Sequence, residues 1–410
     1  MLNRKTFLYL LVILLLANLA VGCNGNKKKP VDLPKPRDLQ GSELDENFVV
    51  ATMDYSVLLF KEVINNEENT MVSPLSIMTA LAMTTNGADG KTKEEMENLL
   101  GGFSIDELNL YLYTYLQNIG SSQELDIANS IWAKKDSAIF KEGFLQSVSD
   151  YYNSDIFYED FNEQTVKYIN AWVNDNTKGM IPNIIDNLSE DDIMCLINAL
   201  AFDASWKKVY SKADISEGIF TNIKGEKETV EFMYSDENLY IKNDKVTGFV
   251  KPYEEDNFSF VALLPNEGVS IIDYVNSLSG KELIQLINNA DYAPVNACLP
   301  KFSYETNLDM NEVLKAMGME IAFDKDYADF TNLFDLVQGN AYISKVIHKT
   351  FISVDELGTK AGATTEIDIS VTSAPIELFN VYLDRPFIYM IVDVKLGLPV
   401  FIGTVMTINK

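Results

Sequence analysis

The chain has 410 residues, of which 47% are hydrophobic, so it is long enough to bury a large core in one or two domains. Its 33 Lys and Arg residues face 60 Asp and Glu residues, which makes the formal net charge -27. That charge repels nucleic-acid phosphates, so we expect no nucleic-acid partner.

The first residues have the pattern of a bacterial lipoprotein signal peptide. Two basic residues precede an apolar run over residues 7–17, which is too short to span a bilayer stably. Gly22 followed by Cys23 resembles a lipobox, although Ala20 stands where leucine is usual. The pattern predicts a signal peptide over residues 1–22 and lipidation of Cys23. The alternative is a plain secretory signal with a chance cysteine.

The next segment, residues 23–41, is polar and rich in proline, with no apolar periodicity. It is predicted to be a lipidated tether that joins the protein to a bacterial envelope membrane. Asn24 stands where some bacteria place an aspartate for inner-membrane retention, which favours the outer membrane. Surface display is a further alternative.

The body, residues 42–410, shows no second linker and no repeat, which indicates one domain. Helical spacing comes first, and Thr92 with Glu95 predicts a capping box before an apolar helix face. Residues 342–354 then alternate at a period of two, which is typical of a strand. Two apolar β-prone runs, 387–394 and 400–408, predict a buried hairpin. Helices followed by strands favour an α+β fold.

The polar motifs exclude the common enzyme classes. His348 is the single histidine, so a hydrolase would need its nucleophile beside that one residue. No nucleotide-binding or zinc-protease motif occurs. Cys195 and Cys298 lie in apolar stretches and are expected to be buried thiols, not metal ligands. We therefore expect no enzyme, no cofactor and no metal site, and a hydrogen-bonded core role for His348.

Several segments in order along the chain resemble those of the serpins, the serine protease inhibitor family. They are NTMVSPLSIMTALAM from residue 69, LDIANSIWA from 125, INAWVNDNTKGMI from 169, INALAFDASW from 197, LPKF from 299, LKAMGMEIAFDKDYADFT from 314, HKTFISVDELGTKAGATT from 348 and DRPFIYMIVDVKLGLPVFIGTV from 384. The resemblance covers nearly all of the chain from about residue 42 onward. It implies helices packed on a large central mixed β-sheet, smaller sheets and an exposed reactive-centre loop over about residues 356–380.

The resemblance also implies a function. A serpin offers its loop to a protease, inserts the cut loop into the sheet as an extra strand and traps the enzyme as an acyl-enzyme. The implied partner is a serine or cysteine endopeptidase, held by a monomeric inhibitor. The alternative is a serpin-fold binding protein that is merely cleaved as a substrate.

Small residues dominate the implied hinge, as insertion into a sheet requires. Its residues are Glu356, Gly358, Thr359, Ala361, Gly362, Ala363, Thr364 and Thr365. Family spacing from the hinge glycine implies a reactive bond between Thr372 and Ser373, with Val371 and Ala374 as alternatives. Because these residues are small or β-branched, we expect an elastase-like target.

Further residues match structural positions of the family. Ser73, Ser76, Asn198 and His348 match the polar cluster under the strands where the sheet opens. Trp206 and Lys301 match the breach, the end of the sheet where insertion starts, and Lys301 is expected to pair with Glu356.

Overall fold

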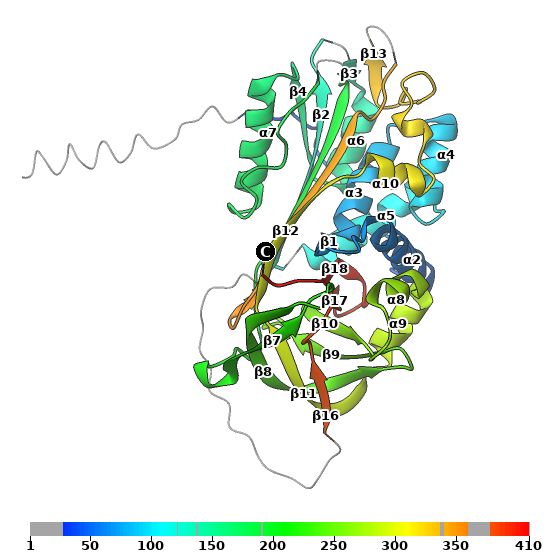
Figure 1. Cartoon of the computed structure of the whole chain (residues 1–410). Helices are drawn as coiled ribbons and strands as arrows, with labels where there is room; N and C mark the ends of the chain where they lie inside the picture. Colours follow the sequence, from blue (N-terminus) through cyan, green and yellow to red (C-terminus); the bar gives the residue numbers. More distant parts are fainter. Residues whose placement is uncertain are drawn as a thin grey trace, which may run out of the picture.

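The computed structural model describes residues 28–120, 122–136, 138–189, 192–336, 340–359 and 378–409. A long sheet covered by helices forms one half of the molecule, and a second, more twisted sheet forms the other half (Figure 1). No helix in these ranges is long and apolar enough to cross a membrane. The α+β fold with a large mixed sheet is therefore confirmed.

Most helices come from the first half of the chain, as the apolar spacing predicted. They are α2 (Glu46–Val63), α3 (Pro74–Thr85), α4 (Gly90–Leu99), α5 (Ile105–Ile119), α6 (Glu142–Tyr151), α7 (Glu163–Asn176), α8 (Ile271–Ser277), α9 (Gly280–Asn288) and α10 (Asn311–Ala316), with 3₁₀ turns η1 (Lys212–Asp214) and η2 (Ile321–Phe323).

The capping box predicted for α4 is wrong. The helix begins earlier, at Gly90, and Asp89 caps it. Thr92 instead accepts a hydrogen bond from the backbone of Asp329, and Glu95 accepts two from the start of η2. Partners more than 200 residues away in sequence use these polar side chains, so a local pattern could not reveal their role.

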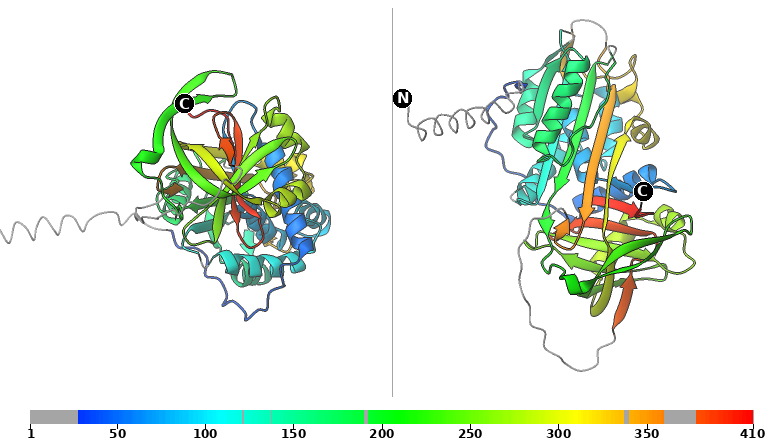
Figure 2. Two further views of the ribbon diagram at one scale, coloured as in Figure 1. Left: turned by 90° about the horizontal axis from the view of Figure 1, so that it is seen from below. Right: turned by 60° about the vertical axis from the view of Figure 1, so that its left-hand side comes forward.

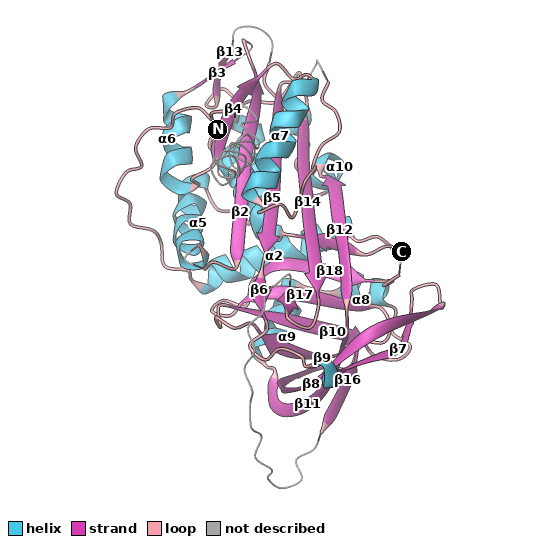
Figure 3. Ribbon diagram, turned by 90° about the vertical axis from the view of Figure 1, so that its left-hand side faces the viewer, coloured by secondary structure: helices cyan, strands magenta, loops and turns pink. Residues whose placement is uncertain are grey.

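The central sheet holds strands that are far apart in the sequence. Its order is β4 (Asp155–Glu159), β2 (Leu125–Lys134), β5 (Met194–Phe202), β14 (Lys345–Val354), then β15 (Gly358–Thr359) and β6 (Ala204–Ser205), with β12 (Phe302–Asp309) also paired to β14. Neighbours β5 and β14 are parallel, whereas β2 pairs β5 and β12 pairs β14 in antiparallel fashion. Figure 3 shows β5 and β14 side by side in the middle of this sheet.

The second sheet is largely antiparallel. It contains β1 (Thr70–Val72), β18 (Pro399–Val405), β17 (Phe387–Asp393), β10 (Phe258–Pro265), β9 (Val246–Pro252), β8 (Lys227–Lys242), β11 (Asp291–Pro300) and β16 (Phe379–Tyr382), with β7 (Ile215–Thr221) on β8. The predicted hairpin is confirmed, because β17 and β18 pair directly and every residue in both strands is buried. A small third sheet joins β3 (Ala138–Phe140) and β13 (Phe334–Leu336).

Apolar packing covers both faces of the central sheet. Helix α3, buried over its whole length, packs on one face against β2 and β5. Helix α7 covers the other face with Ile169 and Val173, which join a separate cluster around Trp132 and Phe157. Cys195 and Cys298 are buried free thiols, as expected, and burial raises the pKa of both.

Residues 28–41, here called the strap, differ from the free tether expected of their composition. The amide of Val31 donates to the carbonyl of Ile156 at the edge of the central sheet, at 2.7 Å. Arg37 pairs with Asp150 of α6 at 2.6 Å, and Lys28 forms an ion pair with Glu159. Figure 2 shows the strap in dark blue along the outside of the body. A polar, proline-rich segment can dock when its partners supply carboxylates and free strand-edge carbonyls.

Candidate functional site

The first feature of interest is the junction between β5 and β14. The two strands pair from Cys195 with Lys345 to Leu200 with Thr350. Beyond that point a two-residue strand, β15, lies between β14 and β6, which continues the line of β5. β15 runs antiparallel to both neighbours. The chain that leaves β14 has therefore already turned back and entered the sheet at this end.

Three hydrogen bonds to backbone carbonyls hold the turn before β15. The amide of Trp206 donates to the carbonyl of Leu357 at 2.9 Å, and its indole nitrogen donates to the carbonyl of Asp355 at 2.8 Å. The amide of Tyr210 donates to the carbonyl of Glu356 at 2.9 Å. Trp206, placed at the breach by the family resemblance, thus contacts the start of the predicted hinge directly.

Thr359, the last residue of β15, is fully buried. Its hydroxyl lies 2.6 Å from the phenol oxygen of Tyr253, whose ring stacks on Trp206 with centroids 4.7 Å apart. The amino-acid sequence offered no signal for Tyr253, because its partners lie 47 and 106 positions away. Thr359 of the predicted hinge therefore contacts Tyr253, which stacks on Trp206 and was not predicted from the sequence.

Lys301 lies between two carboxylates at the breach. Its ammonium is 2.8 Å from Glu356 and 3.2 Å from Glu231. Partial burial opposes the charge of Lys301, but the two carboxylates outweigh it and raise the lysine pKa. The hydrogen bond from Lys301 lowers the pKa of Glu356. The expected ion pair is present, and it ties the turn before the hinge to β8.

A second lysine, Lys251, is buried against Trp206 and Tyr210. It is 1% exposed, pairs with Glu237 at 2.8 Å and lies over the rings of Tyr210 and Trp206 at 4.4 and 5.4 Å. Burial opposes its charge, but Tyr210 and Glu237 outweigh that effect and raise its pKa. A cation held between a carboxylate and two ring faces fixes the orientation of both rings.

The four residues matched to the sheet-opening cluster meet under β5 and β14, and all are completely buried. The amide of Ser73 donates to Nε2 of His348 at 3.1 Å, so Nδ1 carries the proton and donates to the Asn198 side chain at 2.5 Å. Nδ2 of Asn198 donates to the hydroxyl and carbonyl of Ser76. Burial lowers the pKa of His348 to about 3, so the imidazole is neutral at physiological pH.

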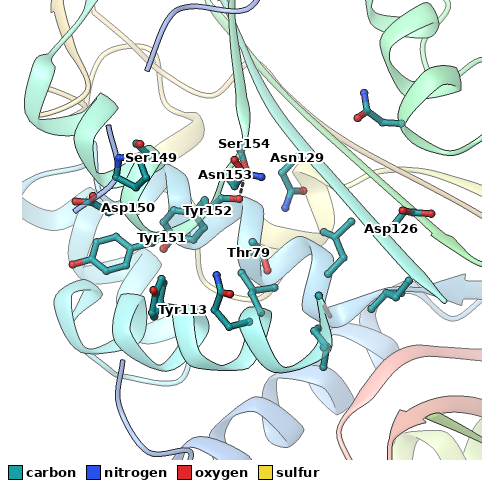
Figure 4. A pocket seen from close by; sticks show the side chains of 18 of the residues that line it. Thr79, Tyr113, Asp126, Asn129, Ser149, Asp150, Tyr151, Tyr152, Asn153 and Ser154 are labelled. Carbon is teal, nitrogen blue, oxygen red and sulfur yellow. Dashed lines mark hydrogen bonds between the residues drawn. The ribbon is translucent and has the colours of Figure 1, made fainter. Parts of the chain in front are cut away.

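Asn129 of β2 extends this cluster toward the surface, because it also accepts a hydrogen bond from Asn198. It lines a cavity of about 730 Å³ between β2, α5 and the end of α6. Figure 4 shows Tyr113, Asp150 and Tyr151 around the same cavity. Asn129 was not singled out from the sequence; its signal was a polar side chain in the buried middle of the strand LDIANSIWAK.

The remaining expected residues lie outside the described part of the chain. These are Cys23, hinge residues 361–365 and residues 371–374 around the expected reactive bond. Among the described residues, no group of three or more His, Cys, Asp or Glu side chains is placed to hold a metal ion.

Comparisons with known proteins agree with this geometry. The chain is 29% identical to the serpin-like protein TK1782 of Thermococcus kodakarensis. The match covers 98% of this chain and 99% of the relative. It is 30% identical to the leukocyte elastase inhibitor of Xenopus laevis over 84% of this chain and 95% of the relative.

Solved structures are also similar. The thermophilic serpin tengpin in its native state is 49% identical, with a TM-score of 0.88 over 92% of this chain and 98% of that one. The latent state of tengpin gives a TM-score of 0.81 over 90% of this chain and 100% of that one. The sequence profile described as "Serpin (serine protease inhibitor)" matches residues 50–408. The chain therefore belongs to the serpin family, whose members are typically protease inhibitors and not enzymes.

Proposed function

We propose that this serpin inhibits serine endopeptidases by loop cleavage, loop insertion and covalent trapping. The observation that supports this most is β15, which already lies between β14 and β6, antiparallel to both. Since β5 and β14 are parallel, a strand that continues from β15 between them would be antiparallel to each. It would gain backbone hydrogen bonds on both edges, as in other cases of strand addition.

The chemistry begins in the protease. Its serine oxygen passes its proton to the protease histidine and attacks the carbonyl carbon of the reactive bond. The amide C–N bond then breaks, an ester remains, and the histidine gives the proton to the leaving amine. Insertion of the freed loop then moves the esterified protease away from the breach before water attacks the ester. The buried Thr359 supports this order, because the first inserting side chain already has its seat against Tyr253.

The target class follows from the residues around the expected bond, Thr372–Ser373. These residues and their alternatives, Val371 and Ala374, are small or β-branched, so they suit a shallow apolar specificity pocket. The similarity to a leukocyte elastase inhibitor supports an elastase-like serine protease as the target. A cysteine protease that reads Val371 is a second target class for the same mechanism.

The cellular site is also part of the proposal. Cleavage before Cys23 and its acylation would attach the inhibitor to a bacterial envelope membrane, with the outer membrane favoured by Asn24. The mass of the N-terminal peptide from membrane-extracted protein tests this, because acyl chains add a defined mass. An unmodified N-terminal cysteine would contradict the anchor.

The function is tested with a soluble form that lacks residues 1–23 and a panel of serine and cysteine proteases. A band that survives denaturing electrophoresis, with a released peptide that begins at Ser373, is the expected result. Cleavage in the loop by several proteases without such a band would instead favour a serpin-fold binding protein that is cut as a substrate.

A matched pair of variants separates insertion from cleavage. Thr359→Arg places a charge where the side chain is 1% exposed, so insertion should fail while the protease still cuts the loop. In Lys360→Glu the change falls on the next residue, which strand alternation would direct to the opposite face of the inserted strand. We expect Thr359→Arg to lose the covalent band and Lys360→Glu to keep it. Equal behaviour of the two variants would contradict the insertion mechanism.

A further inference from the structure

Docking of the strap limits how far the body can lie from its proposed anchor. The first described residue, Lys28, is held by Glu159 at the end of β4 and lies 5.8 Å from the ring centre of Tyr168. Between Cys23 and Lys28 there are only four residues. Five extended residues span at most about 17 Å, so an acylated Cys23 would hold this point of the body close to the bilayer.

The length of β2 in the central sheet gives the distance from this point to the breach. At one end Glu159 of β4 pairs with Lys134 of β2. At the other end of β2, Leu125 pairs with Phe202 of β5. Two residues later, Ala204 of β6 pairs with Thr359. Nine residue steps along a strand correspond to about 30 Å. The anchored point and the start of the reactive loop therefore lie at opposite ends of the sheet, as Figure 1 also shows.

The surface around the anchored point is suited to a bilayer. A cleft of about 600 Å³ between the strap, β3 and β4 is lined by three lysines and three carboxylates, namely Lys28, Lys29, Lys135, Asp136, Glu159 and Asp160. These six charges balance, whereas the whole chain carries -27, so the cleft itself does not add to the repulsion from anionic headgroups. Ile139 at the cleft is 62% exposed and offers an apolar side chain to the interface.

We propose that this end of the molecule, formed by residues 28–31, residues 134–136 with Ile139, and the end of β4, faces the lipid bilayer while the reactive-loop end points away from it. The proposal rests on the lipid anchor proposed for Cys23. It gives the docked strap a role that its composition does not suggest. The strap shortens the tether and thereby sets the orientation in which a soluble protease meets the loop.

The same orientation places a requirement on trapping. Insertion between β5 and β14 would carry the protease toward Met194, which pairs with Ala133 beside the bilayer-facing end. A protease domain of about 200 residues has a radius of gyration of about 16 Å, too large for the gap beneath the docked strap. A released strap, residues 24–41, spans up to about 60 Å. Trapping at the membrane therefore requires the strap to dissociate from β4 and α6.

Energy transfer to acceptor-labelled lipids tests both parts. The lipidated full chain is reconstituted in phosphatidylethanolamine and phosphatidylglycerol vesicles, with a donor dye on Lys135→Cys or, as the matched control, on Tyr292→Cys. Tyr292 is 85% exposed. It lies on β11, three residues before Val295, where the pairing of β11 with β16 begins. Cys195 and Cys298 are buried and do not compete for the dye.

We expect higher transfer from position 135 than from position 292. Insertion of about twelve Gly and Ser residues between Asn26 and Lys27 adds up to about 40 Å of reach and should abolish the difference. A protease that forms the covalent band should lower transfer from position 135.

Three results would overturn the inference. Equal transfer from the two positions in protein that floats with the vesicles rejects the orientation and leaves the anchor intact. Protein that carries no lipid and does not float rejects the anchor, and the orientation with it. Transfer from position 135 that stays unchanged after trapping rejects release of the strap.

Discussion

The indole nitrogen of Trp206 donates a 2.8 Å hydrogen bond to the carbonyl of Asp355, the residue after β14. The ring of Trp206 also stacks on Tyr253, which holds the hydroxyl of Thr359. One aromatic pair therefore contacts both sides of the turn from which the reactive loop departs. This contact holds the turn and β15 against the end of the central sheet.

The bond between Tyr253 and Thr359 is expected to stabilise the seated hinge. Tyr253→Phe leaves the buried threonine hydroxyl without this partner and should lower the free energy of unfolding by about 1 kcal/mol. Thr359→Val should cost a similar amount. Denaturant midpoints of both single variants and the double variant form a cycle, and strictly additive costs would show that the two groups do not interact.

The buried pair of Lys251 and Glu237 gives a larger effect. Lys251→Met leaves a carboxylate that is 7% exposed without its cation, which should cost about 3–5 kcal/mol of unfolding free energy. Replacing both residues, as Lys251→Met with Glu237→Leu, should restore most of that loss. The measurement is urea unfolding followed by tryptophan fluorescence. A double variant no more stable than Lys251→Met would contradict this account.

His348 makes stability depend on pH with a definite sign. Burial lowers its pKa from 6.5 to about 3, so below pH 6.5 the unfolded chain binds a proton that the folded chain does not. The contribution of the neutral imidazole is complete above pH 6.5 and is lost as the pH falls toward 3, by up to about 1.4 kcal/mol per pH unit. The difference in urea midpoint between the wild type and His348→Gln should shrink over this range. A difference that is constant with pH would contradict a neutral buried histidine.

The strap depends on Arg37 and Asp150. Burial raises the pKa of Asp150, but hydrogen bonds from Arg37 and Gln146 outweigh it and lower that pKa. Asp150→Asn removes the charge and should make the strap a faster substrate for limited proteolysis. Asp32→Asn is the matched control, since Asp32 pairs with Lys29 on the exposed surface. Equal cleavage rates of the two variants would show that the Arg37 pair does not hold the strap.

Local patterns were sufficient where neighbours in sequence are also neighbours in space. The hairpin of β17 and β18 was predicted because two apolar runs flank a short turn, and both strands are buried. The capping box at Thr92 failed for the opposite reason, since Asp329 uses its hydroxyl from 237 positions away. The docking of the strap was not predicted, because its composition is that of a linker and its contacts depend on the distant Asp150 and Ile156.

The order of motifs along the chain was enough to indicate the family, because each motif is contiguous. The small-residue hinge stays a prediction of that resemblance, whereas the members of the predicted polar cluster, taken from separate motifs, meet in the fold. The long-range pairing of strands decided where the chain after β14 enters the sheet. Tyr253, Lys251 and Asn129 acquire their roles there, since a sheet places side chains together by register and not by spacing in the chain. The charges of the strap likewise found their partners only in the folded chain, because Glu159 at the end of β4 and Asp150 of α6 lie far away in the sequence.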